Sequence, residues 1–193
     1  MKTIAIVATG GTIAGTGKKG KTAAYHAGEI DIDSIIETIP EINEVAHIKE
    51  YQLMNIDSNE MTHEKWLILK NNIEEILSDD TIDGAVVTHG TDTLDETAYF
   101  LTLTLNTPKP VVLTGAMRPA TATSADGPFN LYQAICLACH GESYNRGVLA
   151  LFSNTIYSGR DIEKVNNLNN HSLDLSNGID ENELNTFKNT RFK

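Results

Sequence analysis

The stretch at 85–93 constrains the fold of this chain more than any other. Its apolar start, 85–87, is typical of a buried strand, and its end, Thr-His-Gly-Thr-Asp-Thr, is typical of a turn that opens a helix. Thr91 and Asp92 are therefore expected at the carboxyl end of a strand, where open α/β sheets bind ligands. Backbone N–H groups at a helix start also favour developing negative charge. The pattern indicates a ligand site at this turn.

The same turn also has a purely structural interpretation. Thr93 and Glu96 have the spacing of a capping box, in which each side chain satisfies a backbone N–H group at the helix start. Asp and Thr are common helix caps by themselves, so Thr91 and Asp92 alone do not establish any chemistry. A site needs further polar residues from other parts of the chain.

The rest of the chain repeats the order strand, helix, strand at the spacing of βαβ units. A short helix is expected that Asp33 caps and Pro40 ends. We therefore predict a doubly wound α/β fold, Rossmann-like, with a mostly parallel sheet and helices on both faces. Strands are expected at 4–8, 45–53, 85–87, 111–113 and 148–152, and longer helices at 62–79, 94–105 and 126–140, the last with Asp126 as its cap.

Composition and charge exclude several classes of protein. The 193 residues are 40% hydrophobic and 21% charged, as in ordinary globular proteins. A net charge of −11 is unfavourable for binding phosphate backbones, so no nucleic-acid partner is expected. The sequence has no apolar run that would cross a bilayer and starts too Gly-rich for a signal peptide, so we expect no membrane partner and a cytoplasmic location. The last segment, 166–193, is expected to be a polar, poorly ordered tail.

Two familiar motifs lack the context that their chemistry needs. Gly15 to Thr22 matches the P-loop pattern, but the strand before it ends near Ala8, so nucleotide binding is kept only as a remote alternative. The Cys-x-x-Cys-His sequence at 136–140 matches a haem attachment pattern, but it lies within an expected apolar helix, where thiols pack. The six histidines show no metal-ligand spacing, and no metal or other cofactor is expected.

Hydroxyl groups recur at the predicted strand ends. Thr12 follows the first strand and Thr91 the middle one, and both stand beside glycines that let a ligand approach the backbone. An alcohol is a weak nucleophile and needs a base or a positive neighbour, for which Asp92 and Lys164, in a later strand-end loop, are candidates. One Thr as nucleophile and the other in a proton relay with Lys and Asp would suit acyl transfer, with backbone amides stabilising the oxyanion.

Five segments of the chain carry a further signal. They are Ala8-Thr9-Gly10-Gly11-Thr12-Ile13-Ala14-Gly15, Thr88-His89-Gly90-Thr91-Asp92-Thr93-Leu94-Asp95-Glu96-Thr97-Ala98, Gly115-Ala116-Met117-Arg118-Pro119, Ser124-Ala125-Asp126-Gly127-Pro128-Phe129-Asn130-Leu131 and Gly159-Arg160-Asp161-x-x-Lys164. Together these segments resemble the bacterial L-asparaginase family over residues 3 to about 165. The resemblance implies hydrolysis of L-asparagine to L-aspartate and ammonia without a cofactor. It places the family's amino-terminal catalytic domain at 1–165 and leaves 166–193 poorly matched.

The resemblance also implies roles for individual residues. Thr12 matches the nucleophile that forms an acyl-enzyme, and Tyr25 matches a residue that helps to activate it from a mobile lid, here 15–28. The relay falls on Thr91, Asp92 and Lys164.

Substrate recognition is implied in the same way. Asp92 matches the residue that holds the α-ammonium group of the substrate, and Ser58 the residue that holds its α-carboxylate. Further substrate-binding positions are expected at Gly11, Asn59, Gly90 and Ala116.

The chain departs from the family in two respects. Asp57-Ser58-Asn59 stands where many relatives carry Gly-Ser-Gln, which leaves the choice between asparagine and glutamine open, because one methylene is worth only about 1–3 kcal/mol in a pocket. Relatives continue into a second α/β domain that completes the neighbouring subunit's site in a tetramer. We therefore expect a homo-oligomer, a missing carboxyl-terminal domain and weak activity in a truncated chain.

Three alternative functions remain at this point. A broader glutaminase/asparaginase uses the same site on a longer substrate. A non-catalytic remnant keeps the fold and binds an amino acid, and a P-loop protein binds a nucleotide. Catalysis is favoured because all five expected catalytic residues are present, whereas a decayed remnant would have lost some of them.

Overall fold

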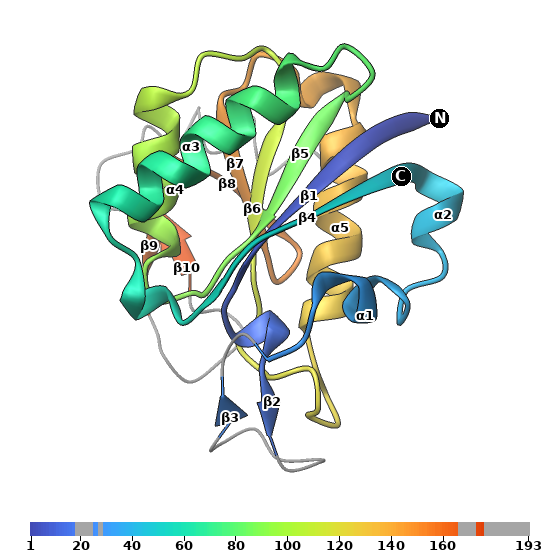
Figure 1. The fold of residues 1–193 in the computed structure, drawn as a ribbon, viewed down its shortest axis with the longest axis vertical. Coiled ribbons are helices and arrows are strands. Elements are labelled where there is room, and N and C mark those ends of the chain that lie inside the picture. Colours follow the sequence, from blue (N-terminus) through green and yellow to red (C-terminus); the bar gives the residue numbers. More distant parts are fainter. Residues whose placement is uncertain (18–24, 27–28, 166–172, 176–193) are drawn as a thin grey trace.

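The computed structural model describes residues 1–17, 25–26, 29–165 and 173–175. At its centre is a six-stranded sheet with the order β4-β1-β5-β6-β7-β8 (Figure 1). The strands from β4 to β7 in this order are parallel, and β8 at the edge is antiparallel to β7. The six strands are β1 (Lys2–Gly10), β4 (Ala46–Ile56), β5 (Gly84–Thr88), β6 (Val111–Thr114), β7 (Val148–Phe152) and β8 (Thr155–Ser158).

The winding direction of the sheet reverses between β1 and β5. In chain order the parallel strands are arranged 2-1-3-4-5, so the chain first builds toward one edge from β1 and then toward the other. Such a reversal leaves a crevice at the carboxyl ends of the two central strands. The arrangement confirms the predicted doubly wound, mostly parallel α/β fold.

The two central strands form because nearly every residue in them is apolar and covered from both sides. Residues 4–7 of β1 and 85–87 of β5 have no exposed surface. Their register places Ile4 beside Gly84 and Ala8 beside Thr88. Because parallel strands in register end together, the segments that follow β1 and β5 emerge side by side at one edge of the sheet.

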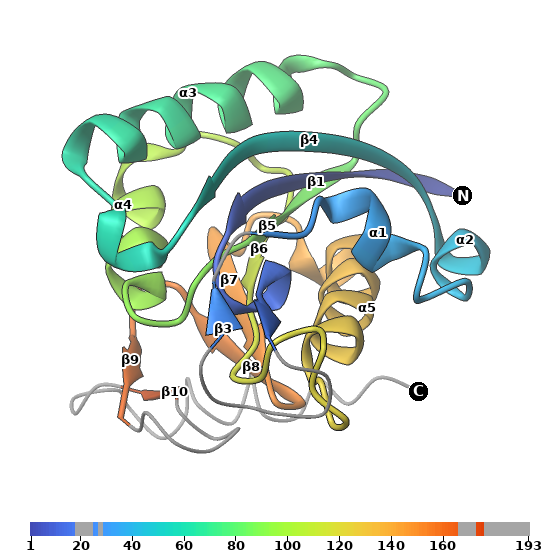
Figure 2. The same cartoon turned by 60° about the horizontal axis from the view of Figure 1, so that its bottom comes forward.

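Helices cover both faces of the sheet (Figures 1 and 2). On one face, α3 and α4 pack against strand residues such as Val7 and Val87. On the other, α5 packs with α1 and α2 against Ile6 and Val86, so alternate residues of one strand serve two separate cores. The helices are α1 (Ile32–Ile36), α2 (Ile42–Val45), α3 (His63–Ser78), α4 (Leu94–Thr104) and α5 (Gly127–Cys139).

Smaller elements complete the described structure. The expected lid at 15–28, the P-loop-like motif at 15–22 and the expected tail at 166–193 lie largely outside the described residues. In the described part of the chain, every helix falls short of the length and apolarity needed to cross a membrane. The smaller elements are η1 (Thr12–Ala14), η2 (Ser58–Glu60), η3 (Gly141–Ser143), β2 (Thr16–Gly17) paired with β3 (Tyr25–His26), and β9 (Ile162–Lys164) paired with β10 (Leu173–Leu175).

Element boundaries differ from the prediction in places. Both β1 and β4 extend further, to Gly10 and Ile56. The segment 153–164, expected as a loop, contains β8 and β9, and three residues of the expected tail form β10. These strands are only three or four residues long, too short to produce a recognisable apolar pattern.

Two predicted helix caps are wrong. Thr93 does precede α4, but its hydroxyl group donates a hydrogen bond to the carbonyl oxygen of Ser58 (2.9 Å) and makes no capping box with Glu96. Asp33 lies inside the first turn of α1, and Asp31 occupies the N-cap position. In the first case a contact with another loop takes the side chain away from its own helix.

Candidate active site

Four loops meet at the carboxyl edge of the sheet, where its winding reverses. They follow β1, β4, β5 and β6, and the first two contain η1 and η2. The loops after β1 and β5 touch through their backbones, since a Cβ atom on Gly11 would lie 2.4 Å from the nitrogen of Gly90. Gly11 also has a φ of +80°, which residues with side chains rarely adopt. Glycine is therefore required for this contact.

The contact gathers hydroxyl groups from three strand ends. Thr12 begins η1 directly after Gly11, and Thr91 directly follows Gly90. A Cβ atom on Gly90 would lie 2.6 Å from Ser58 Oγ, so the loop after β4 closes on the same point. Thr12 is 9% exposed, Thr91 6% and Ser58 4%. The two strand-end threonines that the sequence analysis singled out thus belong to adjoining loops.

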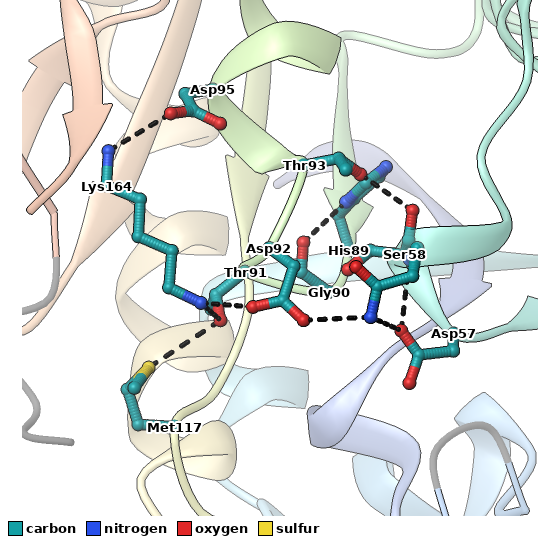
Figure 3. A network of polar contacts seen from close by, with 11 residues as sticks. Asp57, Ser58, His89, Gly90, Thr91, Asp92, Thr93, Asp95, Met117 and Lys164 are labelled. Atoms are coloured by element: carbon teal, nitrogen blue, oxygen red, sulfur yellow. Dashed lines mark hydrogen bonds and ion pairs between the residues drawn. The ribbon is translucent and has the colours of Figure 1, made fainter. Parts of the chain in front are cut away.

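Lys164 joins this group from β9, 72 residues beyond Asp92. Its Nζ donates to Thr91 Oγ1 at 3.1 Å and forms an ion pair with Asp92 Oδ1 (Figure 3). Its backbone N–H donates to Asp95 Oδ2 at 3.0 Å, which anchors β9 to the first turn of α4. The Lys164 side chain is 11% exposed, so its ammonium group is held among these partners.

The hydroxyl group of Thr91 has a second partner in Met117. Thr91 Oγ1 donates to Met117 Sδ at 3.6 Å while it accepts from Lys164 (Figure 3). An ammonium group donates and cannot accept a proton, so in this arrangement Lys164 polarises the Thr91 oxygen and makes its proton more acidic. A thioether is a weak acceptor, which leaves that proton easy to redirect toward a substrate.

Asp92 is held in its ionised form by its neighbours. The hydrogen bond from Lys164 is the main cause that lowers the pKa of Asp92, partial burial acts against it, and a bond from Asn59 also lowers it. Asn59 Nδ2 donates to Asp92 Oδ2 at 3.1 Å. The Asp92 side chain remains 49% exposed, so this carboxylate is both charged and accessible to a ligand.

A buried network lies beneath the turn. His89 has no exposed surface, and its Nδ1 lies 2.8 Å from the Gly90 carbonyl oxygen, which can only accept. Its Nε2 lies 3.0 Å from Thr97 Oγ1, which itself accepts from Trp66 Nε1 at 2.8 Å. These contacts fit a neutral imidazole whose Nδ1 proton is donated to Gly90 and whose Nε2 accepts from the Thr97 hydroxyl group. Burial is the main cause that lowers the pKa of His89, in agreement with a neutral ring.

The loop after β6 is fixed from α5. Asp126 stands at the N-cap position as predicted, but its carboxylate accepts from the backbone N–H groups of Met117 (3.0 Å) and Arg118 (2.9 Å). Asn130 Nδ2 donates to the Gly115 carbonyl oxygen at 2.9 Å. The predicted cap position is confirmed, but the Asp126 carboxylate holds Met117 beside Thr91 and does not bond to its own helix.

The roles expected of two further site residues, Tyr25 and Ala116, stay predictions. Tyr25 belongs to β3, but its side chain is outside what the structure describes, so its role in activating Thr12 stays a prediction. Ala116 is fully buried and packs in the core beside Ile13 and Leu131, so its contact with a substrate also stays a prediction.

The cysteine motif has no sign of metal or redox chemistry. Cys136 and Cys139 are free thiols in α5, and burial is the main cause that raises the pKa of Cys139 to about 11. Within the described ranges, no group of three or more His, Cys, Asp or Glu residues is placed to hold a metal ion.

Sequence reasoning missed three residues that the structure places at the site. Met117 lies within a segment that carried the family resemblance, but nothing in its pattern assigns the thioether to Thr91. Asp95 contacts Lys164 only because β9 crosses α4. Asp57 was noted as a departure from relatives, and it bonds to Asn59 in η2 (Figure 3). The contacts of Met117 and Asp95 depend on how distant segments meet, which local patterns do not encode, whereas the contact of Asp57 is a local cap.

The fold and these contacts define a class: a doubly wound α/β domain with threonine, lysine and aspartate side chains linked at its winding reversal. Comparison with known proteins identifies the family. A family model described as "Asparaginase, N-terminal" matches residues 3–191. The chain belongs to the asparaginase family.

Individual relatives agree with this assignment. A probable cytoplasmic L-asparaginase from Campylobacter jejuni superimposes with a TM-score of 0.87 and 48% identity, over 90% of this chain and 53% of that one. A probable periplasmic L-asparaginase from Haemophilus influenzae is 50% identical over 84% of this chain and 46% of its own length. A glutaminase-asparaginase from Acinetobacter glutaminasificans is 42% identical over 88% and 52%. The chain spans about half the length of the curated relatives it matches.

Proposed function

We propose that this chain carries the catalytic centre of an L-asparagine amidohydrolase, which converts L-asparagine and water to L-aspartate and ammonia. The observation that carries the proposal is the contact of Lys164 Nζ with both Thr91 Oγ1 and Asp92, in a loop that adjoins the loop of the nearly buried Thr12. Membership of the asparaginase family and relatives named L-asparaginase support the reaction class. In this proposal the centre needs no cofactor.

Thr12 is the proposed nucleophile. Its oxygen attacks the side-chain amide carbon, the carbon–nitrogen bond breaks, and the nitrogen leaves as ammonia with the proton that Thr12 gives up. Tyr25, on the expected lid, is assigned to removing that proton from Thr12, as the family resemblance implies. The product of this first step is an ester between Thr12 and the substrate.

Thr91 and Lys164 serve the second step. A water molecule adds to the ester, one of its protons returns to Thr12, and L-aspartate is released. Lys164 polarises Thr91, whose hydroxyl group is then suited to orient and activate the water. The ion pair with Asp92 keeps the ammonium group of Lys164 in place for both steps.

The substrate is held through its α-amino acid group. Asp92 is charged and accessible, and a carboxylate of this kind suits an α-ammonium group. Ser58 is assigned to the α-carboxylate, with Gly11, Asn59, Gly90 and Ala116 as the remaining wall. Because the name of one relative is glutaminase-asparaginase, L-glutamine is the second candidate substrate.

Assembly and location remain proposals as well. We infer a homo-oligomer from the family resemblance, in which a partner chain completes each site. A cytoplasmic location is also proposed, although one relative is named a cytoplasmic enzyme and another a periplasmic one.

Ammonia release by the purified 193-residue chain tests the proposal. L-asparagine should be hydrolysed, and Thr12→Ala should abolish the activity. The matched control is Thr104→Ala, which removes an exposed hydroxyl group at the end of α4 and should leave turnover unchanged. Binding of L-aspartate without turnover would favour a non-catalytic domain instead. A thermal shift with ATP and magnesium but none with L-aspartate would favour nucleotide binding.

A further inference from the structure

Asp57 makes a double contact with one neighbour. It occupies the N-cap position of η2, and its Oδ1 accepts from the backbone N–H of Asn59 at 3.0 Å. The same oxygen also accepts from Asn59 Nδ2 at 3.1 Å. The cap therefore fixes a side chain as well as the turn.

The side-chain amide of Asn59 links two carboxylates. Its Nδ2 donates to Asp57 Oδ1 and, at 3.1 Å, to Asp92 Oδ2. Carboxylates only accept, so the amide orientation is set by chemistry and both of its N–H donors are used. Asp57 thus determines how Asn59 meets Asp92, the residue assigned to the α-ammonium group.

Without Asp57, the charges at this end of the site cancel. Asp92 is already paired with Lys164, so together these two side chains have no net charge. Asp57 is bonded to the neutral amide of Asn59, which also contacts Asp92. It therefore adds one negative charge close to the pair of Asp92 and Lys164. The charge that Asp57 supplies therefore adds to the attraction of an incoming cation toward Asp92.

We propose that Asp57 is a specificity-determining residue that favours substrates with a free, charged α-amino group over α-N-blocked amides. It acts through Asn59, by holding the amide between the two carboxylates, and through its own charge. The inference rests on the proposed function of the site, but it concerns ligand selection and not bond cleavage.

Binding of two matched ligands tests this selection. Asp57→Asn keeps an acceptor at the cap and removes the charge, so L-aspartate should bind about two- to fivefold more weakly, as expected for an exposed charge interaction. Binding of N-acetyl-L-aspartate, which lacks the ammonium group and carries two negative charges, should not weaken. The loss should shrink at high salt, because exposed charges are screened. In kinetics, KM for L-asparagine should rise by the same factor with kcat unchanged.

Asp79→Asn is the matched control. Asp79 is also an exposed carboxylate whose Oδ1 accepts from a backbone N–H and a side chain two residues later, in Thr81, but it follows α3, at the opposite edge of the sheet. The Asp79→Asn substitution removes the same unit of charge from the chain. It should leave the affinities for L-aspartate and N-acetyl-L-aspartate unchanged. Asp57→Ser, which retains a capping oxygen without charge, should behave like Asp57→Asn.

Each outcome decides the inference. Equal weakening of both ligands by Asp57→Asn, or no weakening of L-aspartate binding, would overturn it. The inference would also be overturned if Asp57→Asn and Asp57→Ser bound L-aspartate normally and Asp57→Ala bound it weakly. In that case the capping hydrogen bond alone, and not the charge, would matter. A chain that binds L-aspartate but releases no ammonia refutes the proposed reaction and leaves selection to be decided by these affinities. A wild-type chain that does not bind L-aspartate overturns both.

Discussion

At the scale of single residues, the site depends on one buried amine. Lys164 reaches Thr91 and Asp92 with its side chain and Asp95 with its backbone. Thr91, Asp92 and Lys164 were predicted together from their residue types and from the family resemblance. The partners that tune them, Met117 and Asp95, were not, because their roles arise only where two loops or a strand and a helix cross.

Removing the Lys164 amine tests this arrangement. Lys164→Met should lower kcat/KM about 100-fold or more, the usual effect of losing a group that acts in proton transfer. Because the bond from Lys164 is the main cause that lowers the pKa of Asp92, that pKa should rise, and the acid side of the pH–activity profile should move to higher pH.

Lys70→Met provides the comparison for this variant. Lys70 forms an ion pair with Glu74 within α3, away from the site, and its removal should leave the pH profile unchanged. An unchanged acid limb in Lys164→Met would contradict the proposed coupling between Lys164 and Asp92.

At the scale of elements, the sequence predicts the central strands and the ends of the long helices, but not what the helix-cap side chains bind. The central strands are apolar on both faces, so a simple pattern identified them. Thr93 and Asp126 were assigned to capping from their position in the chain, but the structure uses them to hold neighbouring loops. Helix-cap rules use only the sequence around one helix end, whereas these side chains form hydrogen bonds with other loops of the site.

The network beneath the turn gives a prediction for α4. Thr97→Val keeps the shape of the side chain but leaves Trp66 Nε1 and His89 Nε2 without their shared partner. The free energy of unfolding should fall by about 1–3 kcal/mol, the cost of buried polar groups left unpaired. Urea denaturation measures it, with Thr104→Val in the same helix as the control. A loss equal to that of the control would mean that the network does not stabilise the turn.

At the scale of the whole molecule, excess negative charge opposes the fold at neutral pH. The chain carries a net charge of −11, and several carboxyl groups crowd one another. Burial, followed by contact with Asp33, raises the pKa of Glu50 to about 6. A hydrogen bond with Asp95, followed by burial, raises the pKa of Glu96 to about 7. Both groups favour their protonated form in the folded chain, so the stability they contribute is lost as pH rises.

Glu96→Gln should remove part of this pH dependence. In the unfolded chain Glu96 titrates near pH 4.5, so its contribution is complete below that value and is lost as pH rises through about 7. Relative to wild type, Glu96→Gln should be more stable at pH 8 than at pH 4.5, by less than about 1 kcal/mol because the group is largely exposed. Glu75→Gln, on the exposed side of α3, changes the net charge equally and should show no such difference. Parallel pH curves for wild type and Glu96→Gln would refute the assignment.

The extent of the family also belongs to this scale. The resemblance in the sequence ended near residue 165, but the family match continues to 191 and β10 pairs with β9. The strand order 2-1-3-4-5 was not predicted either, since apolar runs identify strands without saying which strands are neighbours. Contacts between distant segments decide this order.

The most direct test of the account is mass spectrometry of the chain after incubation with an L-asparagine analogue whose acyl-enzyme hydrolyses slowly. We predict an acyl group on the peptide that contains Thr12, attached to the Thr12 oxygen, and no adduct in Thr12→Ala. An adduct on Thr91 instead, or ammonia release that continues in Thr12→Ala, would contradict the assignment of Thr12 as the nucleophile.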